Sequence, residues 1–162
     1  MSKIAPLVCA GLILLVGAVP VAQAADLVKG RIVGRSEAAD VSRTTALAQR
    51  GDAHAQAILG FMYANGRGVP QSYDVAVDWY VQSAEQGDPT GQYLLGLMYD
   101  KGFGVKTDVV LAHKWLNLAA AHAPAHNREN FLRMRDAVGS KMTPAQLDLA
   151  QKLALDFVPA RW

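Results

Sequence analysis

The chain repeats itself with a period of 36 residues. When residues 51–86 are laid over residues 87–122 without a gap, 13 of the 36 positions are identical, where unrelated segments of ordinary composition would share roughly two or three. The identical pairs are Gly51/Gly87, Asp52/Asp88, Gln56/Gln92, Leu59/Leu95, Gly60/Gly96, Met62/Met98, Tyr63/Tyr99, Gly66/Gly102, Gly68/Gly104, Val69/Val105, Ala76/Ala112, Trp79/Trp115 and Ala84/Ala120. A period between about 20 and 50 residues with an apolar and small-residue skeleton is typical of a solenoid.

Each repeat is expected to form two helices. The first helix begins after a capping carboxylate, and in the second repeat a proline takes the first helical position, which suits its fixed φ. A glycine ends the first helix, and a Ser or Asp cap opens the second. In chain order these residues are Asp52, Gly66 and Ser72 in one repeat and Asp88, Pro89, Gly102 and Asp108 in the other. The pattern therefore predicts an all-α fold of antiparallel helix pairs.

Gly60 and Gly96 lie in the middle of the first helix of each repeat. A glycine there costs roughly 1 kcal/mol of helix propensity relative to alanine. We therefore expect a neighbouring helix to approach closely at these positions, with Ala76 and Ala112 on its facing side.

A signature of fixed spacing carries a family resemblance. It consists of Leu59, Gly60, Tyr63, Gly66, Gly68, Val69, Ala76, Trp79, Ala84 and Gly87 in the first repeat, and of Leu95, Gly96, Tyr99, Gly102, Gly104, Val105, Ala112, Trp115, Ala119 and Ala120 in the second. Ala123 stands where the closing glycine is expected. These residues resemble the Sel-one-like repeat (SLR) family, a relative of the tetratricopeptide (TPR) repeats. The resemblance implies a right-handed α/α solenoid and an exported bacterial scaffold that binds other proteins.

The N-terminus has the features of a secretory signal peptide. Lys3 precedes an almost wholly apolar run from Ile4 to Val21, and Ala22-Gln23-Ala24 forms a small-x-small cleavage site. We expect cleavage after Ala24 and export to the periplasm of a Gram-negative bacterium, or secretion. The alternative is an uncleaved membrane anchor, because the apolar run approaches the roughly 17 to 20 residues that a span requires.

Composition excludes several classes of function. Removal of residues 1–24 takes away only Lys3, so the 16 Lys and Arg residues fall to 15 against 14 Asp and Glu residues. This balance does not favour nucleic acid or an anionic membrane surface as a partner. Cys9, the one cysteine, is also removed, so the mature chain can hold neither a disulfide nor a thiolate metal site.

The flanks extend the repeat on both sides. Residues 25–35 have two glycines and no helical stripe, so we expect a flexible arm. The period predicts a half-repeat helix over residues 36–50, with Arg43 at the tryptophan position. Residues 123–158 predict two capping helices, one over 127–138 and one with Thr143 as N-cap and Gln146 closing a capping box. Residues 159–162 form a tail whose aromatic residue, Trp162, is expected either to pack back on the protein or to contact something else.

Catalytic and metal-binding motifs are weak. His122 and His126 are four residues apart, but Pro124 interrupts the helix that would align them. The Gly-x-Gly loops follow helices, so they differ from a dinucleotide-binding loop, which follows a strand and has a third glycine. We therefore expect no cofactor, no metal site and no enzymatic activity.

A surface remains as the candidate functional site. The free positions of the two first helices form parallel stripes with a spacing of three to four residues: His54, Ala57, Phe61 and Ala64, then Thr90, Tyr93, Leu97 and Asp100, with Asn65 and Lys101 at the rim. In the resembled family these helices line the concave side, which predicts a groove for a peptide or partner helix. The alternative is that Tyr93 and Leu97 are inter-repeat core.

The sequence thus predicts a non-enzymatic interaction scaffold or adaptor. Two alternatives stay open: an enzyme or enzyme subunit that acts on cell-wall material, and a membrane-anchored assembly factor. Self-association is a further way for two repeats to complete a binding surface.

Overall fold

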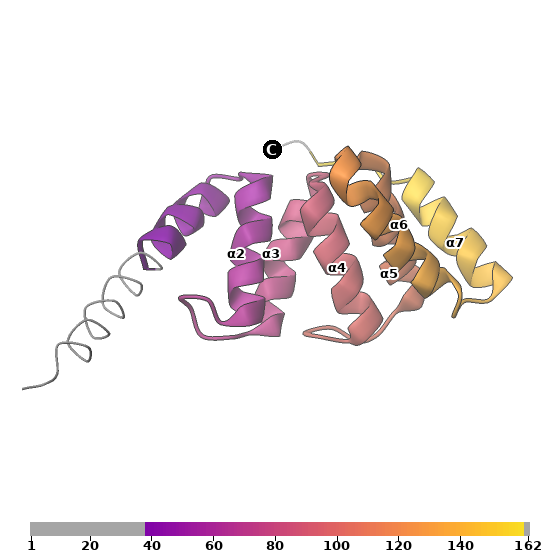
Figure 1. The fold of residues 1–162 in the computed structure, drawn as a ribbon, viewed down its shortest axis with the longest axis horizontal. Helices are drawn as coiled ribbons and strands as arrows, with labels where there is room; N and C mark the ends of the chain where they lie inside the picture. The colour runs from indigo at the N-terminus through magenta and orange to yellow at the C-terminus, as the bar shows by residue number, and fades with distance from the viewer. Residues whose placement is uncertain (1–37, 161–162) are drawn as a thin grey trace, which may run out of the picture. The chain divides into compact units, whose positions relative to one another are not determined.

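The computed structural model describes residues 38–160 (Figure 1). The predicted signal peptide, the arm over 25–35, Ser36, Glu37, Arg161 and Trp162 lie outside these residues. Within residues 38–160 helices are the only regular secondary structure, which confirms the all-α class.

Seven helical segments follow one another within residues 38–160. They are residues 38–49, α2 (Ala53–Asn65), α3 (Tyr73–Glu85), α4 (Pro89–Lys101), α5 (Val109–His122), α6 (Ala125–Gly139) and α7 (Pro144–Leu155). From α2 to α6 each helix packs against the next, and α2 also contacts α4. This packing in chain order confirms the α/α solenoid.

The predicted helix ends are confirmed. The Asp52 carboxylate accepts a hydrogen bond from the amide of Ala55, and the Asp88 carboxylate accepts one from the amide of Gly91, both at 2.7 Å. Ser72 and Asp108 cap α3 and α5 in the same way. Gly66 and Gly102 end α2 and α4 in the left-handed conformation, with φ of 66° and 74°.

The close approach at the mid-helix glycines is also confirmed. A Cβ added to Gly60 would lie 3.0 Å from the carbonyl oxygen of Ala76, and one added to Gly96 would lie 3.2 Å from that of Ala112. Both distances are shorter than ordinary van der Waals contact, so these glycines allow α2 to pack on α3 and α4 on α5.

The largest core cluster joins both repeats to α7. Its buried members are Ala64, Ala76, Val77, Tyr80, Ala84, Leu95, Met98, Trp115, Leu118 and Ala154. A second cluster of Ala48, Ala55 and Leu59, with Trp79 packed on it, ties the helix over 38–49 to the first repeat. The tryptophans of the two repeats therefore lie in different surroundings.

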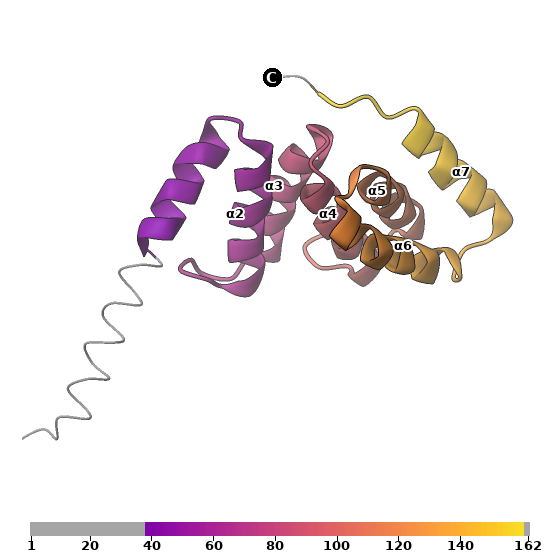
Figure 2. The same cartoon turned by 45° about the horizontal axis from the view of Figure 1, so that its top comes forward.

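The two C-terminal helices both pack against α5, on different sides of it (Figure 2). The predicted start of α6 at residue 127 is corrected to Ala125, because the Pro124 carbonyl accepts from the amides of Asn127 and Arg128 and so opens the helix earlier. The predicted capping box of α7 is confirmed: the Thr143 hydroxyl accepts from the Gln146 amide, and the Gln146 side chain accepts from the Thr143 amide.

Candidate peptide-binding groove

The predicted groove on the first helices is interrupted by α6. Tyr93 stacks on Phe131 of α6, with ring centroids 4.2 Å apart. Leu97 packs on a buried cluster that includes Leu116 and Val138. Tyr93 and Leu97 are therefore in contact with the next helices, as the inter-repeat alternative expected. The third large residue, Phe61, is 39% exposed and lines a hollow of only about 120 Å³.

The smaller members of the two stripes are scattered between core and surface. Ala57 and Ala64 are buried, whereas His54 is exposed, with Nδ1 3.5 Å from the Asp88 carboxylate. Thr90 is half-buried, and the exposed Asn65 side chain donates to the Phe61 carbonyl. These residues do not form one surface, and whether any of them binds a partner stays a prediction.

Asp100 belongs to a local ion-pair cluster. Its carboxylate lies 2.8 Å from the ammonium groups of both Lys101 and Lys141. Burial acts to raise the pKa of Asp100, but the hydrogen bonds and charges of the two lysines outweigh it and hold the pKa below its usual value. Asp100 therefore joins α4 to the turn before α7 and is a structural group.

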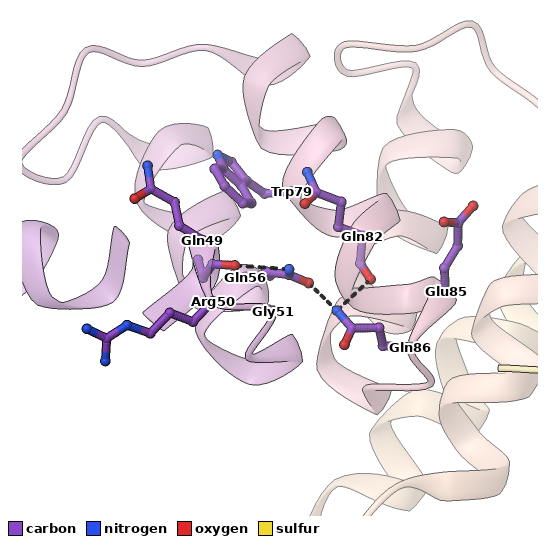
Figure 3. Close-up of a pocket in the computed structure, with 9 residues that line it drawn as sticks. Gln49, Arg50, Gly51, Gln56, Trp79, Gln82, Glu85 and Gln86 are labelled. Carbon is purple, nitrogen blue, oxygen red and sulfur yellow. Dashed lines mark hydrogen bonds between the residues drawn. The ribbon is translucent and has the colours of Figure 1, made fainter. Parts of the chain in front are cut away.

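A larger groove lies elsewhere, between the helix over 38–49 and the first repeat (Figure 3). It has a volume of about 720 Å³ and is open to solvent. We call it the Trp79 groove; its lining comes from residues 48–51, from Gln56 of α2, and from Trp79, Gln82, Glu85 and Gln86 at the exposed side of α3. It combines one aromatic ring with amide side chains and one charge of each sign, which suits a peptide better than a small charged substrate.

A chain of glutamine hydrogen bonds holds the floor of the Trp79 groove. The buried Gln56 donates its side-chain amide to the Ala48 carbonyl at 3.1 Å. Gln86 in turn donates to the Gln56 side-chain oxygen at 2.7 Å and to the Gln82 carbonyl at 3.3 Å. Figure 3 shows these bonds below the Trp79 ring. The side-chain nitrogens of Gln56 and Gln86 thus both have acceptors within the protein, so these contacts are formed before a ligand arrives.

The corresponding face of the second repeat is covered by the chain's own C-terminal tail. The Phe157 ring packs edge-on against Trp115, with centroids 5.4 Å apart. Pro159 lies against Gly87, and the Ala160 amide donates to the Glu85 carbonyl at 2.7 Å. Pro159 and Ala160 thus pack back on the protein, whereas Trp162, the aromatic residue that the prediction concerned, lies outside the described residues.

A lysine side chain completes the tail's contacts. The Lys114 ammonium lies 4.1 Å from the Trp115 ring centroid and 5.4 Å from that of Phe157. Burial lowers the pKa of Lys114, while the charge of Glu85 acts to raise it. Both aromatic rings therefore share one cation at the edge of the contact.

Sequence reasoning missed the Trp79 groove because it assigned Trp79 to the repeat skeleton alone. The aromatic partner of Trp115 is Phe157 of the tail and not a residue of the preceding repeat, so the repeat pattern itself carries no signal for an open face at Trp79. The docked tail had no periodic signal at all.

The described residues give little support for other chemistry. No group of three or more His, Cys, Asp or Glu side chains in residues 38–160 is placed to bind a metal ion. The His122 ring contacts the Leu118 carbonyl, and Pro124 separates it from His126, which lies in α6. Gly66, Gly68, Gly102 and Gly104 have positive φ, as turns between helices require. None of the helices in the described part is both long and apolar enough to span a membrane.

Comparison with known proteins agrees with this geometry. Residues 53–88 and 89–123 each match the Sel1 repeat. Among solved structures, a protective antigen present in uropathogenic Escherichia coli strains, which displays an SLR fold, is 30% identical over 72% of this chain and 24% of its own, with a TM-score of 0.67. A Sel1 repeat protein from Oxalobacter formigenes is 38% identical over 54% of this chain and 25% of its own, with a TM-score of 0.53.

The chain thus spans about a quarter of the length of those two structures. A search of curated proteins found no match. Sel1 repeats are generally protein-interaction scaffolds and typically not enzymes. From its two matched repeats and its helix-pair packing, we conclude that the chain belongs to the Sel1-like repeat (SLR) family.

Proposed function

We propose that this protein is a non-enzymatic scaffold that binds an extended segment of a partner protein in the Trp79 groove. One observation carries the proposal: the groove is open in the first repeat, while the chain's own tail covers the same face of the second repeat. The contact of the tail with the second repeat supports the proposal, because the same face there holds an extended segment.

The chemistry of the lining supports a peptide ligand. Trp79 offers a large apolar surface at low entropic cost, which is typical of the residues that dominate protein interfaces. The glutamine side chains and the carbonyl groups at the ends of two helices supply polar contacts around it. Among the described residues that line the groove Glu85 is the only carboxylate, so this part of the chain does not supply the converging carboxylates that the cell-wall enzyme alternative requires.

The proposed location is the periplasm, or the outside of the cell after secretion. The support is the signal-like N-terminus with its Ala-x-Ala site before residue 25. Intact-mass measurement of the protein purified from the envelope fraction tests the location. A mass that begins at residue 25 is the expected result, and an intact N-terminus in the membrane fraction would establish the anchored alternative.

Partner capture tests the function. The bait is the tagged protein expressed in its own host, compared with a Gln82→Trp variant that fills the groove and a Gln151→Trp control. Both positions are exposed on helices, and only the first lines the groove. We expect the same partner with the parent and the control and its loss with Gln82→Trp. Equal capture by all three would place the binding site elsewhere.

A further inference from the structure

The two repeats share the same backbone frame around Trp79 and Trp115. Gly51 and Gly87 both have a φ of 90°. Each donates its amide to the carbonyl three residues earlier at 3.0 Å. The Gln56 side chain donates to the Ala48 carbonyl at 3.1 Å, and its counterpart Gln92 donates to the Ala84 carbonyl at 3.2 Å. For each residue that makes a contact on the second repeat, the corresponding residue of the first repeat is therefore found by subtracting 36 from its number.

Each contact of the tail then has an open counterpart in the first repeat. Phe157 packs on Trp115, which corresponds to Trp79, in the wall of the open groove. Pro159 lies 3.4 Å from a Cβ built on Gly87, whereas a Cβ built on Gly51 meets no described atom within 4 Å. The Ala160 amide donates to the Glu85 carbonyl, which corresponds to that of Gln49. Among residues 38–160 no amide donates to the Gln49 carbonyl.

One substitution between the repeats reverses the charge at the aromatic contact. Lys114, which lies over both rings of the second repeat, corresponds to Asp78. Asp156 precedes Phe157 in the tail that lies near Lys114. A ligand that lies on the first repeat in the same way would instead meet Asp78 at the position of Lys114 and the negative ends of two helix dipoles. Of the two charged residues that line the groove, Arg50 is opposed by Glu85, whose charge also acts on Lys114. A basic residue before the aromatic residue complements that surface.

We propose that the Trp79 groove binds an extended basic–aromatic–x–Pro segment of a partner protein in the way that the second repeat holds Phe157 to Ala160. The aromatic ring lies on Trp79, the proline lies on Gly51, and the amide after the proline donates to the Gln49 carbonyl. The basic residue lies beside Asp78. This inference rests on the proposed function and adds the chemistry of the partner segment.

The test uses fluorescein-labelled peptides and the full mature chain, with binding followed by fluorescence anisotropy. The reference probe is Lys-Phe-Val-Pro-Ala with a C-terminal amide. We expect its affinity to fall at least tenfold when Phe or Pro is replaced by Ala, and severalfold at low salt when Lys is replaced by Asp. Gln82→Trp should abolish binding, and Gln151→Trp should leave it unchanged.

Two further variants test the charge preference of the groove and whether the chain's own C-terminus occupies it. Asp78→Lys should reverse the preference, so that the Asp-Phe-Val-Pro-Ala probe binds more tightly than the Lys probe. Deletion of Arg161 and Trp162 should leave the affinity unchanged, because we place a partner segment and not the chain's own C-terminus in the groove.

Four results would overturn the inference. Binding that appears only after the deletion would assign the groove to the chain's own C-terminus. A dimer that Gln82→Trp converts to monomer would assign it to a second copy. If Gln82→Trp loses the captured partner but the parent binds none of the peptide probes, the proposed function stands and the basic–aromatic–x–Pro sequence of the segment is refuted. Equal probe binding by the parent and Gln82→Trp would refute the groove itself.

Discussion

The glycine in the middle of α2 provides the sharpest test of how the repeats pack. In a Gly60→Ala variant the new methyl group would lie 2.6 and 2.7 Å from two ring carbons of Tyr80 and 3.0 Å from the Ala76 carbonyl oxygen. The Tyr80 ring is fully buried and the Ala76 carbonyl belongs to the helix backbone, so neither can move aside freely. The substitution therefore forces α2 and α3 apart.

The expected magnitude follows from two opposing effects. Alanine gains roughly 1 kcal/mol of helix propensity over glycine, whereas overpacking a filled core costs about 1–3 kcal/mol. Because the contacts at Gly60 are this short, we expect the upper end of that cost and a net loss of about 1–2 kcal/mol in the free energy of unfolding. With a urea m-value of about 2 kcal/mol/M, the midpoint should fall by about 0.5–1 M.

Gly139 is the matched control. It is also helical, but a Cβ there would lie 3.5 to 3.6 Å from its neighbours in His113 and Leu147, which is ordinary contact. Gly139→Ala should therefore raise stability by about 0.5 kcal/mol. The assay is urea unfolding followed by circular dichroism at 222 nm. A Gly60→Ala variant as stable as Gly139→Ala would refute the argument that close approach selects glycine.

Three further predictions concern the tail and two titratable groups. Phe157→Ala should lower the free energy of unfolding by about 1–2 kcal/mol, because the contact of the half-buried ring with Trp115 is lost. The C-terminus should also be cleaved faster by proteases, and an unchanged cleavage rate would count against the docked tail. Two lysines hold the pKa of Asp100 low, so the stability that its carboxylate contributes is present above the ordinary pKa of 3.8 and is lost as pH falls through the lowered pKa. The urea midpoint of Asp100→Asn should therefore fall less between pH 5 and pH 2.5 than that of the parent. Equal losses would contradict this reasoning. Burial lowers the pKa of His113, and the charge of Arg135 adds to this effect, while Asp136 acts against it. The unfolded chain therefore binds the proton more readily, so the free energy of unfolding should decrease as pH falls below about 6.5. In His113→Gln the decrease between pH 7 and pH 5 that comes from this histidine should be absent.

The helix ends and the glycine contacts could be predicted from sequence because they are local or repeat with the period. An N-cap carboxylate such as Asp52 acts within three residues, and Gly60 recurs at residue 96 where the same helix approach recurs. Each of these features is decided by backbone geometry that a short stretch of sequence already specifies.

The site could not be predicted in the same way. A stripe of residues with the same spacing on a helix can face either solvent or the next helix. Whether Tyr93 is free to bind a partner depends on the position of Phe131, 38 residues later in the chain. The Trp79 groove depends on a long-range difference: the tail reaches Trp115 and leaves the equivalent face of the first repeat open. An extended tail has no hydrophobic period, so no pattern in the sequence predicts where it docks.

The central claim is that a partner segment lies in the Trp79 groove, and site-specific photo-crosslinking tests it most directly. A benzophenone side chain is placed at Arg50, an exposed residue at the edge of the groove, and separately at Gln151 on α7, and cells are irradiated before the envelope is extracted. We predict a partner adduct from position 50 that is absent from position 151, with the crosslink mapped to a basic–aromatic–x–Pro segment. An adduct from position 151 alone, or none from position 50 while capture of the partner persists, would contradict the account.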